Sequence, residues 1–140
     1  MSWQACLDEG RAKKVSPDLE RAHSVRAMSE RKFRWLAIQK MDAETASPIL
    51  ANYFDALSEL CDSMLLARGL RVSAAARDCV TCFIADVLKE GTLAEIFDRY
   101  RLIRNRINYY GKIVTLDTAS EGVKEILEVF TKLKSKYAKF

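Results

Sequence analysis

The sequence predicts an all-α protein, an up-and-down helical bundle of four to five long helices with a short N-terminal helix. Three observations support this prediction. Apolar residues recur every three or four positions along most of the chain, and the two prolines stand at Pro17 and Pro48, where they suit helix starts. No segment alternates apolar and polar residues for long enough to form a half-buried strand. Short connections between long amphipathic helices favour antiparallel neighbours, as in a bundle.

The first two helices precede residue 42. A short helix packs against the body and ends at Gly10, and it holds Trp3, Cys6 and Leu7. A long helix starts at Ser16-Pro17-Asp18, with Ser16 as the N-cap and Pro17 at the first helical position, and it extends to about Met41. The residues expected on its buried stripe are Leu19, Ala22, Val25 and Met28.

The middle of the chain predicts two further helices. Ser47-Pro48 starts the clearer one, which Gly69 ends, and its buried face consists of Leu50, Tyr53, Phe54, Leu57, Leu60, Cys61, Met64 and Leu65. Ser73 is expected to cap the next one, which ends at Gly91. The inward residues of this helix are Cys79, Val80, Phe83, Ile84, Val87 and Leu88.

Two capping boxes predict the last helices. The first, from Thr92 to Glu95, opens a helix that ends at Gly111 and whose core face carries Ile96, Tyr100, Ile103 and Ile107. Residues 111–117 are expected to be an extended loop. The second box, from Thr118 to Glu121, opens a helix whose inward residues are Val123, Ile126, Leu127, Phe130, Leu133 and Tyr137.

Length and composition indicate one domain, residues 1–140, in a soluble globular protein. The 140 residues are 49% hydrophobic and 30% charged, which suffices for a core of its own. The N-terminus does not resemble a secretory signal, and no apolar stretch approaches the roughly 18 residues of a membrane helix. We therefore expect a cytoplasmic protein whose four cysteines are reduced, without a disulfide.

A cluster of cations marks the candidate site. The net charge is only +4, yet no acidic residue lies between Arg99 and Lys112. Arg101, Arg104, Asn105 and Asn108 are spaced so that their side chains share one edge of a helix. Forked guanidinium donors suit phosphate oxygens, and amides suit base edges. The cluster therefore predicts a nucleotide site without a metal or other cofactor, to which Lys112 contributes. The alternative is that these cations complement the helix dipole, which favours each by about 0.3–1 kcal/mol.

The segment from Arg104 to Gly111 resembles the signature of the HEPN (higher eukaryotes and prokaryotes nucleotide-binding) family. Members carry Arg-Asn or Arg-Asp, three variable residues and then His; here Arg104 and Asn105 match, but Tyr109 stands where His is expected. The resemblance implies a helical bundle that dimerises so that two motifs meet in a cleft. Many members are metal-independent ribonucleases or toxins paired with a nucleotidyltransferase. It also implies that Arg104 steadies the phosphorane charge while the motif His moves protons.

Tyr109 changes what the resemblance implies about catalysis. A free phenol has a pKa of about 10, so roughly one molecule in a thousand is ionised at pH 7, whereas imidazole titrates near about 6.5. We expect a nucleotide- or RNA-binding HEPN-type protein, a degenerate ribonuclease in which any proton transfer falls to Tyr109. Some partnered members have a tyrosine, two places after the His, that the transferase modifies; Gly111 is at that position here. Tyr110 is expected to pack at the helix end.

Two functional alternatives stay open beside this expectation. One is an active metal-independent endoribonuclease that uses Arg104, with Tyr109 or a water molecule for proton transfer. The other is a helical protein-interaction module whose arginines contact an acidic partner, for instance a nucleotidyltransferase, and which binds no nucleotide.

An acidic residue, two cysteines and the histidine are further site candidates in the sequence. Family members often place a polar or acidic residue on the second bundle helix to orient the arginine, and among Tyr53, Asp55 and Glu59 we select Glu59 as the supporting residue. The pair Cys79 and Cys82 has the spacing of a zinc or redox motif, but it lies within a predicted helix and is expected to be buried. The chain's one histidine, His23, is expected at the surface.

Overall fold

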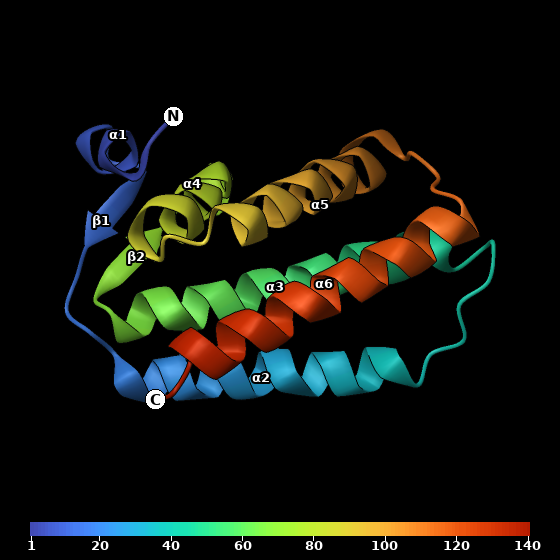
Figure 1. Ribbon diagram of the computed structural model, residues 1–140, viewed down its shortest axis with the longest axis horizontal. Helices are drawn as coiled ribbons and strands as arrows, with labels where there is room; N and C mark the ends of the chain where they lie inside the picture. The colour runs from blue at the N-terminus through green and yellow to red at the C-terminus, as the bar shows by residue number, and fades with distance from the viewer.

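The computed structural model describes residues 1–140 and confirms an all-α helical bundle (Figure 1). Its four long helices are α2 (Leu19–Ala37), α3 (Ala46–Ala67), α5 (Gly91–Tyr110) and α6 (Leu116–Tyr137). Each runs opposite in direction to the long helix before it in the chain (Figure 1). The shorter elements are α1 (Trp3–Asp8), β1 (Ala12–Lys14), β2 (Leu70–Val72), η1 (Ala74–Ala76), α4 (Asp78–Cys82) and η2 (Phe83–Val87).

Helix α3 forms the centre of the bundle because its apolar residues cover most of its surface. All eight residues that the three-four spacing placed inside are buried, which confirms the expected face. It packs against α2, α5 and α6. It begins at Ala46, and the Ser47 hydroxyl does not cap it but accepts a 2.9 Å hydrogen bond from the backbone N–H of Val114. That bond ties the loop between α5 and α6 to the start of α3.

The buried face predicted for α2 is correct at Ala22, which is fully buried, but wrong at Leu19 and Met28. Leu19 and Met28 are 55% and 47% exposed, whereas the buried residues are Ala22, Ser29, Phe33 and Leu36. Three residues advance a helix by about 300°, so a strict spacing of three drifts away from any fixed face. The N-cap is Asp18 rather than Ser16, and its carboxylate accepts a 3.0 Å hydrogen bond from the Arg21 backbone N–H. The helix ends at Ala37, before Met41.

The helix expected between Ser73 and Gly91 is divided into η1, α4 and the π-helical turn η2. Its inward residues are buried as expected except Val87, which is 39% exposed. Gly91 does not end this segment but begins α5, so the capping box at Thr92 does not form. Helix α6 likewise begins before its expected box, since the Thr115 hydroxyl caps it by accepting from the Thr118 backbone N–H.

The ends of the last two long helices agree better with expectation. Gly111 ends α5 in a left-handed conformation with φ of 63°, which glycine adopts without steric cost. Along α5, Tyr100 is buried, and Ile96, Ile103 and Ile107 are half-buried against the core. Along α6, Ile126 and Leu133 are fully buried, but Leu127 is 38% exposed.

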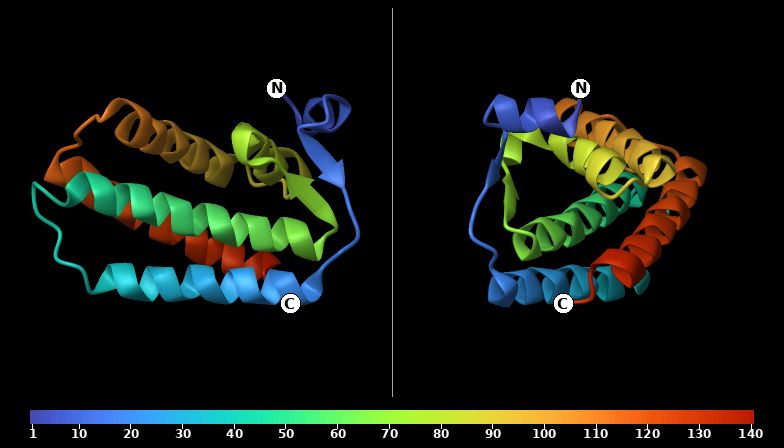
Figure 2. Two further views of the ribbon diagram at one scale, coloured as in Figure 1. Left: turned by 180° about the vertical axis from the view of Figure 1, so that it is seen from behind. Right: turned by 60° about the vertical axis from the view of Figure 1, so that its left-hand side comes forward.

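Two predictions about the N-terminal segment are wrong. Strands β1 and β2 pair antiparallel, with Ala12 opposite Val72. Each strand has three residues, which is too short for an alternating pattern to be visible in the sequence. Cys6 and Cys79 form a disulfide, while Cys61 and Cys82 are buried free thiols. The expectation of reduced thiols came from the expected cytosolic setting, and the spacing of two cysteines 73 residues apart gives no sign of their pairing. The β1–β2 pairing folds the N-terminal segment back toward α4 at one end of the bundle (Figure 2).

None of the helices combines the length and the apolar character that a membrane crossing requires.

Candidate functional site

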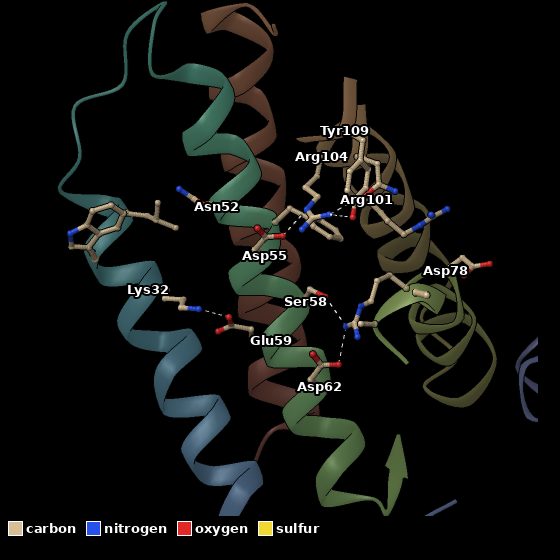
Figure 3. A pocket seen from close by; sticks show the side chains of 17 residues that line it. Lys32, Asn52, Asp55, Ser58, Glu59, Asp62, Asp78, Arg101, Arg104 and Tyr109 are labelled. Atoms are coloured by element: carbon tan, nitrogen blue, oxygen red, sulfur yellow. Dashed lines mark hydrogen bonds and ion pairs between the residues drawn. The ribbon is translucent and has the colours of Figure 1, made fainter. Parts of the chain in front are cut away.

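A groove of about 780 Å³ lies beside α3, with α2 on one side and α5 and the start of α4 on the other (Figure 3). Four cations line it, and so do four carboxylates. The cations are Lys32, Arg77, Arg101 and Arg104, and the carboxylates are Asp55, Glu59, Asp62 and Asp78. The formal charges of the lining residues therefore cancel, so the groove is polar but not a basic patch.

Arg104 is held in place by neighbours on two helices. Its Nε donates a 2.9 Å hydrogen bond to Oδ1 of Asp55 on α3. Its Nη1 lies 3.3 Å from both the Asn105 Oδ1 and the Tyr109 hydroxyl oxygen, and the guanidinium carbon lies 5.7 Å from the Tyr109 ring centre. These contacts orient the guanidinium and give Nη2 no partner within the chain. Nη2 is therefore free to donate a hydrogen bond to a ligand oxygen.

Burial shapes the electrostatics of the pair formed by Arg104 and Asp55. Burial raises the pKa of the Asp55 carboxyl group, and the nearby Arg104 cation opposes this increase only in part. Desolvation disfavours the Arg104 cation, but the Tyr109 phenol and the Asp55 carboxylate outweigh it and raise the Arg104 pKa. A partly buried, imperfectly compensated carboxylate in a groove is typical of functional sites, although structural ion pairs also produce it.

The other groove cations are paired as well. Arg77 Nη2 donates to the Ser58 hydroxyl at 2.7 Å and to the Asp62 carboxylate at 2.8 Å, and burial raises the Asp62 pKa. Lys32 pairs with Glu59 across α2 and α3 (Figure 3). On α5, Arg101 Nε donates to Asp98 at 2.8 Å. An anionic ligand must therefore compete with carboxylates already present.

Four of the predicted α5 residues line this groove, namely Arg101, Arg104, Asn105 and Tyr109. Two do not. Asn108 and Lys112 are exposed and outside it. Spacing predicted Asn108 on the Arg104 edge, but only Tyr109 reaches the groove from the last turn of α5, and Lys112 follows the end of that helix.

The supporting residue was misidentified. Glu59 lines the groove, but it pairs with Lys32, and Asp55, one turn earlier on α3, contacts Arg104. A four-residue step on one helix face separates the two candidates, and the sequence does not show which one α5 approaches. The signal for an acidic stripe was present: polar residues recur along otherwise apolar α3 as Asn52, Asp55, Glu59 and Asp62.

The structure tests the predicted positions of Tyr110 and His23 and gives the exposure of Tyr109. Tyr110 is 83% exposed, so its expected packing role is wrong, because Gly111 ends the helix beyond the body of the bundle. Tyr109 is 69% exposed at the groove. His23 lies at the surface as expected, edge-on to Phe140 and away from the groove residues.

No protein-family model matches the chain, and neither a curated protein nor a solved structure shows significant similarity to it. No three His, Cys, Asp or Glu side chains are grouped as metal ligands would be. The arrangement itself offers an oriented guanidinium, an adjacent amide and an exposed phenol at one edge of a polar groove. Such a set can donate hydrogen bonds to a phosphate and stack on a base.

Proposed function

We propose that this chain is a nucleotide- or RNA-binding protein of the HEPN type, in which a phosphate group binds at Arg104. The observation that carries the proposal is the orientation of Arg104 by Asp55, with Asn105 and Tyr109 beside it on α5. This agrees with the role that the sequence resemblance implies, an arginine fixed by an acidic residue of another helix.

The chemistry of binding follows from the free side of the guanidinium. Asp55 occupies Nε, so Nη2 and the outward edge of Nη1 are the donors that meet a phosphate oxygen. A charge-assisted hydrogen bond of this kind contributes about 1.5–3 kcal/mol. Asn105 adds an amide at the same edge, and Tyr109 adds an exposed ring for a base.

The proposal extends to assembly. Tyr109 and Tyr110 are both exposed at the end of α5, and large exposed aromatic side chains are typical of interfaces. A homodimer with this end of α5 at its two-fold axis places two copies of Arg104 near each other. In the same proposal the protein is cytoplasmic and is paired with a nucleotidyltransferase.

Arg104→Ala tests the proposal, with Arg106→Ala as the matched control. Arg106 is exposed on the same helix, makes no ion pair within the chain and does not line the groove. Fluorescence anisotropy with a labelled eight-nucleotide single-stranded RNA at two salt concentrations measures binding. We expect Arg104→Ala to weaken binding about 10- to 150-fold and to lower the salt slope by about 0.7, whereas Arg106→Ala changes affinity less than about threefold.

Equal binding by wild type and Arg104→Ala contradicts the phosphate site. Absence of any RNA or nucleotide binding favours instead the helical interaction module.

A second candidate function, an active metal-independent endoribonuclease, is favoured by one contact. The Tyr109 hydroxyl lies 3.3 Å from Arg104 Nη1, so a proton-transfer group and a charge-stabilising group are adjacent. This candidate requires RNA cleavage that persists in EDTA and that Arg104→Ala abolishes. Binding without such cleavage supports the degenerate ribonuclease.

A further inference from the structure

Trp35 is the groove residue whose exposure is least expected. It lies near the end of α2, it is 56% exposed, and it lines the same groove as Arg104. Tryptophan is large and apolar, so in most proteins most of its surface is buried. Leu36, the next residue, is 3% exposed and joins the core. Helix α2 is therefore packed at this point, and the Trp35 indole lies on its outward side.

Trp35 and Tyr109 belong to opposite sides of the groove. Helix α3 lies between α2 and α5 (Figure 3), and packed helices have axes about 8–10 Å apart. Both helices pack against α3 and do not pack extensively against each other, so their axes are at most roughly 16–20 Å apart. A base stacked between two rings needs each ring centre within about 4.5–7 Å of its own, whereas Trp35 and Tyr109 stand on two helices that α3 separates. The two aromatic side chains suit two different bases.

The surroundings of Trp35 favour a charged strand over an apolar peptide. Only six of the 17 residues that line the groove are hydrophobic. Lys32, which pairs with Glu59, precedes Trp35 by one turn on α2. The exposed Asn52 amide on α3 has no hydrogen-bond partner within the chain. A cation, a free amide and an exposed indole are the groups that bind the phosphate, edge and face of an unpaired nucleotide.

We propose that Trp35 is a base-stacking subsite, which binds an unpaired base of a single-stranded RNA whose phosphate is held at Arg104. This inference rests on the proposed function. It makes binding depend on RNA length. A mononucleotide at Arg104 does not reach Trp35, whereas a strand of several nucleotides crosses α3 and engages both sides of the groove.

Binding of 5′-UMP and of oligouridylates of two, four and eight nucleotides tests the subsite. The variants are Trp35→Ala and Trp35→Phe, with Ile38→Ala as the control for loss of an exposed large apolar side chain outside the groove. We expect Trp35→Ala to weaken binding of the eight-nucleotide RNA about 5- to 150-fold and to leave 5′-UMP binding unchanged. Trp35→Phe keeps most of the affinity, and Ile38→Ala changes the affinity less than about threefold.

Tryptophan fluorescence distinguishes base stacking from a purely structural role of Trp35, because only stacking of a base changes the Trp35 emission when RNA binds. The chain has two tryptophans, and Trp3 is buried at the other end of the bundle. Stacking of a base on Trp35 quenches its emission in the wild type, and Trp35→Phe removes this change while RNA still binds. Circular dichroism and sedimentation velocity of each variant confirm an unchanged fold and oligomeric state.

Three outcomes overturn the subsite, and the first two are distinguishable from failure of the proposed function. If wild type binds RNA and Arg104→Ala weakens it, but Trp35→Ala binds all lengths normally, the phosphate site stands and the subsite is wrong. If Trp35→Ala converts a dimer to a monomer, Trp35 belongs to a protein interface. If wild type binds neither RNA nor 5′-UMP, both proposals fail.

Discussion

Oδ1 of Asp55 lies 2.9 Å from Nε of Arg104, and this contact joins the central helix α3 to α5 at the groove. The carboxylate has two opposing effects on a phosphate ligand. It fixes one edge of the guanidinium, which lowers the entropy lost on binding, and its negative charge repels the ligand. The balance between these effects depends on whether Asp55 is ionised.

We therefore expect RNA affinity to rise as the pH falls from 7.5 toward the raised pKa of Asp55. Burial raises the Asp55 pKa, so protonation begins at a higher pH than in a free carboxyl group. Protonation removes a negative charge from a groove whose charges otherwise cancel, and Asp62, with its own raised pKa, adds to the effect. One unit charge about 4 Å away in water contributes about 1 kcal/mol, or about fivefold in affinity. Oligouridylate is a suitable probe because uracil does not titrate in this range.

Asp55→Asn is the control for the pH effect, since asparagine keeps the shape and an acceptor oxygen for Arg104. The variant should bind more tightly than wild type at pH 7.5, with a weaker dependence on pH. A wild-type affinity that falls on acidification, or an Asp55→Asn profile equal to that of wild type, contradicts the role given to this carboxylate.

Tyr109→His tests whether the groove is a degenerate ribonuclease site. Imidazole has a pKa of about 6.5 and exchanges protons at neutral pH. At this position it lies beside the Arg104 guanidinium. General acid–base catalysis contributes about 10²–10⁴-fold, so we expect EDTA-resistant cleavage at least about 100-fold faster than in wild type. The double variant with Arg104→Ala should be inactive. Cleavage no faster than that of wild type would show that the missing histidine is not what limits this site.

The sequence predicted the parts of this structure that depend on local patterns. Helix α3 was recognised with its full buried face because its three-four spacing is unbroken, and Gly111 ended α5 because a left-handed residue there suits glycine. The edge with Arg101, Arg104 and Asn105 was also foreseen from spacing on one helix.

The features missed depend on which elements meet in space. Asp55 and Glu59 are both outward residues of α3, and only the position of α5 makes Asp55 the partner of Arg104. Trp35 lines the groove through the packing of α2, and no pattern near it indicates a site. The disulfide likewise depends on a β1–β2 pairing too short to be read from the sequence.

Gly122→Ala should destabilise the protein because α6 approaches its neighbours closely at this residue. An added Cβ lies 2.6 Å from Leu50 Cδ1 and 2.8 Å from Tyr100 Cε1, and both side chains are buried. Alanine gains about 0.5–1 kcal/mol in helix propensity, but overpacking costs about 1–3 kcal/mol. We expect a net loss of about 1–2 kcal/mol in the free energy of unfolding. Gly91→Ala is the control, since no atom lies within 4 Å of its Cβ, and it should be neutral or stabilising in urea denaturation.

Replacing both Cys6 and Cys79 by alanine should lower the free energy of unfolding by about 2–4 kcal/mol, the typical contribution of a disulfide. The bond closes a loop with a sequence separation of 73 and anchors α1 to α4. Without it, the N-terminal segment keeps only noncovalent contacts such as the edge-on packing of Trp3 and Phe83.

Cys61→Ala is the control for this change, because it removes a buried sulfur without removing a cross-link. A reducing agent should lower the denaturation midpoint of wild type and leave the double variant unchanged. Because disulfides are rare in cytosolic proteins, thiols should first be alkylated in the intact cell and the Cys6 and Cys79 peptides identified by mass spectrometry without reduction. Two alkylated thiols in the cell, together with a midpoint indifferent to the reducing agent, would mean that the noncovalent contacts alone hold α1 against α4.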